Sequence, residues 1–252
     1  MAEIYFSGQG KVFVADRDGN GNPGVFRDVG NVPALSITLE TDVLEHQESR
    51  TGSRLTDLRL VRDRKANVNM TLESFNTKNL QMLLYGTTAS GSVTPVTNEA
   101  SPAGLAVGDI VALGSPHVTS VAVNTYTGGT AWVLDTDYSL DAAAGLITIL
   151  SVSKGTRIEV DYTPAASTVV PIFKDISKER YIRFVGLNTA NSNAPVTVEL
   201  YRVAFDPAST IDLINDELAQ FELAGSVLYD STRDTGNQNS VLGGFGRIIQ
   251  AA

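Results

Sequence analysis

Two segments of alternating apolar and polar residues flank a long charged excursion in the first third of the chain, and this arrangement limits the fold more than any other feature. In 34–41 and again in 67–75, apolar residues occupy every second position. A period of two is typical of half-buried β-strands. The intervening residues 42–65 have a polar tip at 49–53. The pattern therefore predicts two strands joined by a long hairpin arm.

A short leucine-rich segment follows the second of these strands. Thr77 is a candidate N-cap, Leu80, Leu83 and Leu84 have helical spacing, and Gly86 is a candidate stop. The sequence predicts one short helix over 77–85 that packs on the sheet.

The middle of the chain differs in composition from the two ends. Residues 87–170 contain 2 basic and 7 acidic residues, and stretches rich in Gly, Ser, Thr and Pro bracket them at 87–104 and 163–168. We therefore expect 88–170 to be an inserted small all-β module within a domain formed by 1–87 and 171–252. Short β-branched or aromatic runs predict its strands at 110–113, 118–123, 131–134, 146–150 and 158–162.

The last third returns to long strand patterns. Strands are predicted at 181–187, 195–205 and 218–229, whereas 211–217 fits neither the helical nor the strand period. After a polar, glycine-rich stretch at 231–246, Ile248 and Ile249 form an apolar pair. This pair could dock on a neighbouring chain or on the chain's own core.

Composition excludes several classes of site. The sequence has no cysteine, which rules out disulfides, thiolate metal sites and cysteine nucleophiles. The first ten residues lack the pattern of a signal peptide, and no run of about 18 apolar residues predicts a membrane span. A formal charge of −9 should repel nucleic acid rather than bind it.

One loop matches two ligand-binding motifs incompletely. Residues 19–24 fit the glycine pattern of a dinucleotide site, but extended sequence follows where that site needs a helix. Residues 16–21 fit the start of a calcium loop, yet Arg27 occupies the position that needs a bidentate glutamate. A hairpin turn is the interpretation we favour, because Asp, Asn and Gly tolerate positive φ.

The remaining candidates for chemistry are scattered. His46 and His117 are the two histidines, and neither lies near a nucleophile motif. A glycosidase pair could lie among the carboxylates of the insert, and its aromatic residues could form a sugar-stacking platform, although turn and core roles are commoner. These carboxylates are Asp135, Asp137, Asp141 and Asp161, and the aromatics are Tyr126, Trp132, Tyr138 and Tyr162. The sequence thus predicts no catalytic, cofactor or metal site, with a scattered-carboxylate hydrolase ranked last.

The arm carries a local excess of positive charge. Six of the 19 basic residues lie between 50 and 65, namely Arg50, Arg54, Arg59, Arg62, Arg64 and Lys65. Arginine pairs well with carboxylates at interfaces. A solvated hairpin face or a local nucleic-acid patch would give the same pattern. On an acidic chain, however, another copy is the complementary partner, and such a contact between different patches propagates head to tail.

This order of parts resembles the major tail tube proteins of long-tailed bacteriophages. The likeness is carried by the strands at 34–41 and 67–75, the arm at 42–65 between them, the helix at 77–85 and the return to β-structure. It covers about 1–86 and 171–252. It rests on architecture and general sequence character rather than on an invariant motif, and the insert departs from the minimal pattern.

The resemblance implies a mainly β fold, with a tail-tube-type β-sandwich and one short flanking helix. It further implies a non-enzymatic virion protein that assembles into hexameric, stacked rings around a channel for DNA ejection. Its partners would be other copies of itself, a tape-measure protein and tail terminator or tip proteins, with DNA only as passing cargo and no membrane contact. Its location would be the virion tail, and the host cytoplasm during assembly. The alternative from another class is a carbohydrate- or protein-binding module of a virion surface protein or an adhesin.

Overall fold

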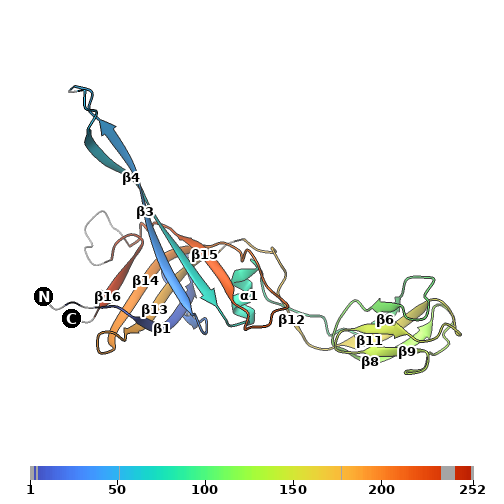
Figure 1. The fold of residues 1–252 in the computed structure, drawn as a ribbon. Coiled ribbons are helices and arrows are strands. Elements are labelled where there is room, and N and C mark those ends of the chain that lie inside the picture. The colour runs from blue at the N-terminus through green and yellow to red at the C-terminus, as the bar shows by residue number, and fades with distance from the viewer. Residues whose placement is uncertain (1–2, 4, 51, 177, 234–241, 251–252) are drawn as a thin grey trace. The chain divides into compact units, whose positions relative to one another are not determined.

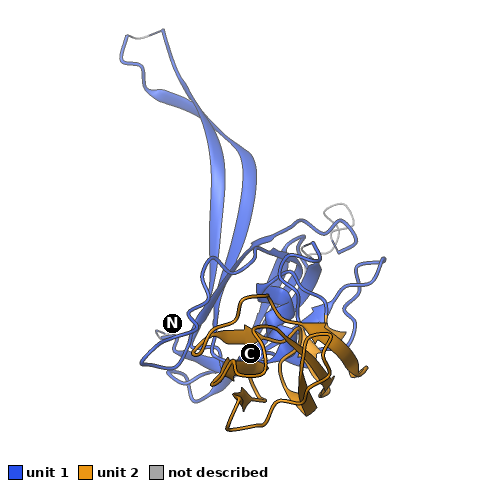
Figure 2. Cartoon of the chain, turned by 90° about the vertical axis from the view of Figure 1, so that its right-hand side faces the viewer, with its two compact units in different colours: residues 1–87, 170–252 blue, residues 88–169 orange. Residues whose placement is uncertain are grey.

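The computed structural model describes the chain except for residues 1–2, 4, 51, 177, 234–241 and 251–252. The fold is mainly β, as predicted. In the described residues, sixteen strands and the single helix α1 (Thr77–Leu83) form two compact units, which Figure 2 colours separately. Unit 1 comprises 1–87 and 170–252, and unit 2 comprises 88–169. These boundaries lie within one residue of the division predicted from composition.

Unit 1 contains one large antiparallel sheet. Its strands are β1 (Gly8–Asp16), β2 (Arg27–Asp28), β3 (Ala34–Gln47), β4 (Thr56–Leu72), β13 (Glu179–Asn188), β14 (Ala194–Phe205), β15 (Phe221–Val227) and β16 (Gly246–Gln250). They follow the order β2-β1-β13-β14-β15-β4-β3, and β16 also pairs with β14. The predicted strands at both ends of the chain therefore meet in the same sheet.

Strand β14 belongs to both layers of the sheet, because its two halves pair with different strands. The first half of β14 pairs with β16, and its last residues, Val203–Phe205, pair with β15. One core contains Val14 of β1 and Ile182 of β13 together with Val68 of β4 and Leu223 of β15. The two ends of the sheet thus pack on each other, so that a single curved sheet supplies both layers of the expected sandwich (Figure 1).

Helix α1 closes this core. Met82 and Leu83 are buried in it. The N-cap is Asn76 rather than the predicted Thr77, and its side-chain oxygen accepts a hydrogen bond from the Asn79 N–H at 2.9 Å. An asparagine cap satisfies a donor that the first helical turn leaves free. The fully buried Asn79 amide donates to the carbonyl oxygens of Val29 and Ser74, which fixes the helix to the preceding loops.

Unit 2 has a core of its own. Its strands are β5 (Ala89–Ser90), β6 (Val96–Ala100), β7 (Ile110–Ala112), β8 (Val118–Thr125), β9 (Tyr138–Asp141), β10 (Leu146–Ile149), β11 (Ile158–Pro164) and β12 (Thr168–Val169). They form sheets of order β7-β10-β9 and β6-β11-β8, while β12 pairs with β5 where the unit begins and ends. Ile147, Ile149 and Ile158 are completely buried between these strands.

One strand predicted for the insert was wrong, and some of its strands were not predicted. No strand covers 131–134, where isolated bridges occur only at Ala131 and Leu134. Conversely, β6 and β9 were not predicted, because 96–100 and 138–141 contain polar residues that obscure the strand pattern. A turn at 141–145 joins β9 to β10, with Gly145 at a φ of +69°.

The backbone of the C-terminal apolar pair joins the sheet of its own chain, but the two side chains remain exposed. Ile248 and Ile249 belong to β16 and pair with Val198 and Thr197 of β14. The ambiguous segment 211–217 forms neither a helix nor a strand. Of the glycine-rich stretch at 231–246, residues 234–241 lie outside the described residues.

Candidate assembly surface

The loop after β1 is a tight turn. The Asp18 carboxylate accepts hydrogen bonds from the backbone N–H groups of Asn20 and Asn22, and Gly21 has a φ of +81°. These bonds, led by that from Asn22, hold the pKa of Asp18 below its usual value. Strand β2 rather than a helix is the next regular element, which agrees with the turn interpretation of both glycine motifs. The described residues contain no group of three or more His, Asp or Glu side chains arranged to hold a metal ion.

The carboxylates of the insert support its turns. Asp137 is buried, accepts a hydrogen bond from the Val133 N–H and pairs with Lys154 at 2.6 Å. Asp141 accepts from two backbone N–H groups of the 141–145 turn, and Asp161 accepts from the Asn98 N–H. Asp137 and Asp141 therefore stabilise turns, whereas Asp161 links β11 to β6.

The aromatic residues of the insert do not form the sugar-stacking platform that we considered. Trp132, Tyr138 and Tyr162 are buried in the core of unit 2. Tyr126 is exposed, but the Arg157 guanidinium lies over its ring at 3.8 Å from the centroid. The structure therefore places these rings in the core or under an arginine.

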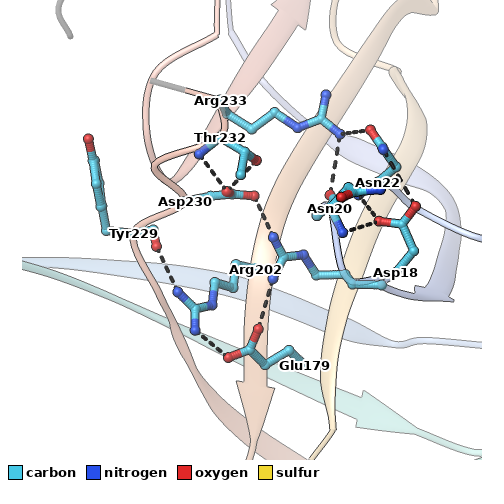
Figure 3. Close-up of polar contacts among 11 residues, drawn as sticks. Asp18, Asn20, Asn22, Glu179, Arg202, Tyr229, Asp230, Thr232 and Arg233 are labelled. Carbon is cyan, nitrogen blue, oxygen red and sulfur yellow. Dashed lines mark hydrogen bonds and ion pairs between the residues drawn. The ribbon is translucent and has the colours of Figure 1, made fainter. Parts of the chain in front are cut away.

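Five arginines in the body of unit 1, Arg17, Arg180, Arg183, Arg202 and Arg247, are paired with carboxylates. The Arg17 side chain is 9% exposed and contacts Glu179 at 2.8 Å and Asp230 at 2.6 Å. Arg202 also contacts Glu179, and the Asp230 carboxylate accepts hydrogen bonds from Thr232 (Figure 3). This cluster joins the end of β1, the start of β13 and the segment after β15.

Charge and hydrogen bonding keep these carboxylates ionised. The hydrogen bond from Arg202 is the main cause that lowers the pKa of Glu179. Burial by itself raises the pKa of Asp230, but the hydrogen bonds from Thr232 and the charge of Arg17 outweigh it, and the pKa is lowered.

A second ion cluster lies on β14. The buried Glu199 carboxylate contacts Arg183 of β13 at 2.5 Å and Arg247 of β16 at 2.7 Å. Burial raises the pKa of Glu199, yet its bonds to both arginines more than compensate, so the pKa is lowered. Because the two arginines come from the strands on either side of β14, the cluster fixes β16 in the sheet.

The arm of unit 1 is different, because most of its basic side chains are unpaired. Strands β3 and β4 pair antiparallel from Ala34↔Thr71 to Gln47↔Thr56, which makes the hairpin arm that the sequence predicted (Figure 1). All six candidate residues of the arm are exposed: Arg50, Arg54, Arg59, Arg62, Arg64 and Lys65. Arg59 lies 3.7 Å from Glu45, and Lys65 lies 3.7 Å from Asp63. Among the described residues, the other four form no ion pair.

The positive charge is confined to one part of the arm. Residues 42–65 contain six basic and five acidic residues. Asp42 and Glu45 lie in β3 and Glu48 follows it, while every basic residue lies at the tip or in β4. The expected basic arm is therefore a ribbon with an acidic strand beside a basic one.

The arm also presents an apolar face that the sequence analysis missed. In the register of β3 with β4, Leu44 lies opposite Leu60 and His46 lies opposite Leu58. Residues that pair directly share a face of the ribbon. Leu44, Leu58 and Leu60 are therefore grouped on one face, and all three are exposed. The signal was present in the sequence as three leucines at alternating positions of a charged segment.

The outer edge of β3 is a third feature of this surface. β3 is the last strand in the sheet order, so within the described part of the chain only β4 pairs with it. It is 14 residues long and contains neither lysine nor proline. Natural proteins usually protect exposed edge strands with such residues, because free N–H and C=O groups pair readily with other chains.

The comparisons with known proteins add a family but no activity. No helix in the described residues is both long and apolar enough to cross a membrane. The search of curated proteins found no match. The family model described as "Protein of unknown function UCP028589" matches residues 5–249, and the chain therefore belongs to that family.

Proposed function

We propose that this protein is a structural virion subunit that assembles with copies of itself into stacked rings, forming a phage tail tube through which DNA passes into the host. The observation that carries the proposal is the arm, whose leucine face is exposed and four of whose arginine side chains have no carboxylate partner among the described residues. Hexameric rings, the tape-measure protein and the terminator or tip proteins come from the family resemblance described above.

The arm needs a partner for physical reasons. An isolated two-stranded ribbon is marginally stable in water, and a layer must cover at least one face to stabilise it. Beyond the body of unit 1, β3 and β4 pair only with each other in the described residues. Covering Leu44, Leu58 and Leu60 with another protein would remove apolar surface from water and stabilise the extended conformation.

The outer face of the β3-β4-β15 layer suits a channel wall. Alternation places Ser36, Asn69 and Ala224 side by side on the face that points away from the core. The paired segments 34–39, 66–72 and 221–227 contain no lysine or arginine. Phosphate contacts with cationic side chains would slow a passing duplex, so a small, polar and cation-free wall favours passage.

Assembly of purified protein tests the proposal. We expect sedimentation velocity to show large species and negative-stain electron microscopy to show hollow rings or tubes, for the chain alone or co-expressed with tape-measure and chaperone partners. The matched control replaces 40–65 with a two-residue Asn-Gly turn between Leu39 and Ala66, which pair directly across β3 and β4. This variant should keep the far-UV circular dichroism of unit 1 but remain monomeric. Monomers of the intact chain under every condition would refute the proposed function.

A further inference from the structure

The connection between β14 and β15 is an exposed segment that is both acidic and apolar. Residues 206–220 contain four acidic residues and no lysine or arginine. Leu213, Ile214 and Leu218 are 81%, 97% and 84% exposed. Large apolar side chains grouped at this exposure mark an interaction surface. A connection of this length without regular structure is also typical of functional loops.

A groove lies beside this connection. Its volume is about 440 Å³, and its walls include Asp212, Leu213 and Leu218. Phe75 and Phe221 line it from the sheet side, with ring centroids 5.4 Å apart, and Phe75 is itself exposed. An acidic rim around an apolar floor can accept leucine side chains that are flanked by cations.

The arm has the complementary composition. Residues 50–65 contain six basic and two acidic residues, and the leucine face lies among them. Outside that segment, unit 1 contains 11 basic and 19 acidic residues, so the arm tip and β4 are its positive region. Opposite charge and apolar surface on both sides favour association and fix its orientation.

The two surfaces lie at opposite ends of β4 and cannot meet within one copy. Phe221, which ends the connection, pairs with Leu72, the last residue of β4. Leu58 lies 14 residues earlier in the same strand. At about 3.3 Å per residue, this separation is about 46 Å. Any contact between them must join two different molecules, and such a head-to-tail contact propagates.

We infer that the arm of one copy binds the 206–220 connection of the next copy, with its leucine face in the Phe75–Phe221 groove and its arginines against Asp212, Asp216 and Glu217. The inference rests on the proposed self-assembly and names the surface that receives the arm. The contact repeats along the assembly, because each copy offers a free arm at one end and a free groove at the other.

Charge reversal tests the contact. The arm variant carries Arg59→Glu and Arg62→Glu, the loop variant carries Asp216→Arg and Glu217→Arg, and a third chain carries all four changes. Each two-residue variant should weaken assembly at least tenfold in sedimentation equilibrium, because like charges then meet across the contact. The four-residue variant should return to within about threefold of the original chain, since the charges again match.

A matched control separates local pairing from net charge. The arm variant with Asp135→Arg and Glu159→Arg in unit 2 has the same net charge as the four-residue variant but leaves the loop unchanged. It should remain as weak as the arm variant. All substituted residues lie on the surface or are half-buried, so each monomer should keep the circular dichroism spectrum of the original chain.

Crosslinking gives an independent readout, because the chain contains no cysteine. A mixture of Leu58→Cys and Ile214→Cys chains should give covalent dimers with a short bis-maleimide. A mixture of Leu58→Cys with Leu134→Cys, which lies in unit 2, should not.

If the original chain assembles but the loop variant assembles equally well, or the four-residue variant is not restored, the inference is wrong and the proposed function stands. If the original chain never assembles, both are wrong.

Discussion

Leu44 of β3 and Leu60 of β4 lie directly opposite each other on one face of the arm, and each residue is 48% exposed. Cross-strand pairs of this kind stabilise a sheet when another layer covers them. Within the described residues, no core cluster of unit 1 includes either leucine. Their packing partner therefore belongs to another molecule in the proposed assembly.

Replacing both leucines should separate assembly from folding. In the Leu44→Thr, Leu60→Thr chain, we expect the free energy of unfolding of the monomer to change by less than about 0.5 kcal/mol, as for other surface changes. Assembly should weaken by about 2 kcal/mol, or about 30-fold, because two half-buried leucines no longer contribute apolar burial. Sedimentation equilibrium measures the second quantity and urea unfolding of the monomer the first.

Leu134→Thr is the control for this prediction, because Leu134 is also 48% exposed but lies in unit 2. Its assembly constant should match that of the original chain. Equal weakening in both variants would mean that exposed leucines act non-specifically.

Unit 2 should be removable without loss of unit 1. Ala89 and Val169 pair directly across β5 and β12, so a short Gly-Ser linker can join residue 87 to residue 171. The core of unit 1 contains no residue of 88–169. We expect the shortened chain to fold cooperatively and to assemble, and isolated 88–169 to fold alone. Calorimetry of the full chain should show two transitions that match those of the separate units. An unfolded shortened chain would show that the insert is integral to the fold.

The sequence predicted well those elements in which one face is buried and the other is exposed, because the side chains then alternate between apolar and polar. Val68, Met70 and Leu72 alternate strictly because one face of β4 is buried, and this pattern located the strand correctly. The composition change near residue 87 located the unit boundary for a similar reason, since each unit has its own core.

The parts that the sequence did not predict depend on contacts between distant residues. The sequence around Glu199 does not indicate an ion pair. Only the folded sheet places Arg183 and Arg247 on either side of this glutamate. Likewise, the segment 131–134 is apolar enough for a strand, but Trp132 is buried without ladder pairing around it. To predict the leucine face of the arm, the register of β3 with β4 must be known, and the sequence alone does not specify this register.

The ion clusters predict how the stability of unit 1 depends on pH. Glu179, Glu199 and Asp230 have pKa values that are lowered in the folded state. A lowered folded pKa contributes stability above the unfolded value, which is about 4 for these groups, and this stability is lost as the pH falls through the folded value. We expect unfolding midpoints to be nearly constant from about pH 7 to 5 and to fall below about pH 4.5.

Glu199→Gln should reveal the contribution of one cluster. At neutral pH, the variant should lose about 3 kcal/mol, because Arg183 and Arg247 keep their charges without the carboxylate. The loss should shrink as the pH falls below about 4, because the unfolded original chain then gains a proton on this glutamate, and it should be smallest once the pH lies below the lowered folded pKa. Far-UV circular dichroism of the chain without unit 2 is the suitable probe, because the single tryptophan, Trp132, reports only on unit 2. The exposed Glu222→Gln is the control, and an equal effect there would contradict a specific role of Glu199.

The cation-free face of the β3-β4-β15 layer leads to a prediction about DNA. Ser36 and Ala224 lie on either side of Asn69 in the register of this face. In the Ser36→Lys, Ala224→Lys chain, tubes should still form, but a short duplex present during assembly should co-sediment with them at low salt and be released at higher salt. Tubes of the original chain, and of a Thr136→Lys, Ala144→Lys control in unit 2, should retain little duplex. If the control retains as much duplex as the first variant, added cations act wherever they are placed, and this face is not the wall of the channel. Binding of the duplex by the original tubes would contradict the prediction as well.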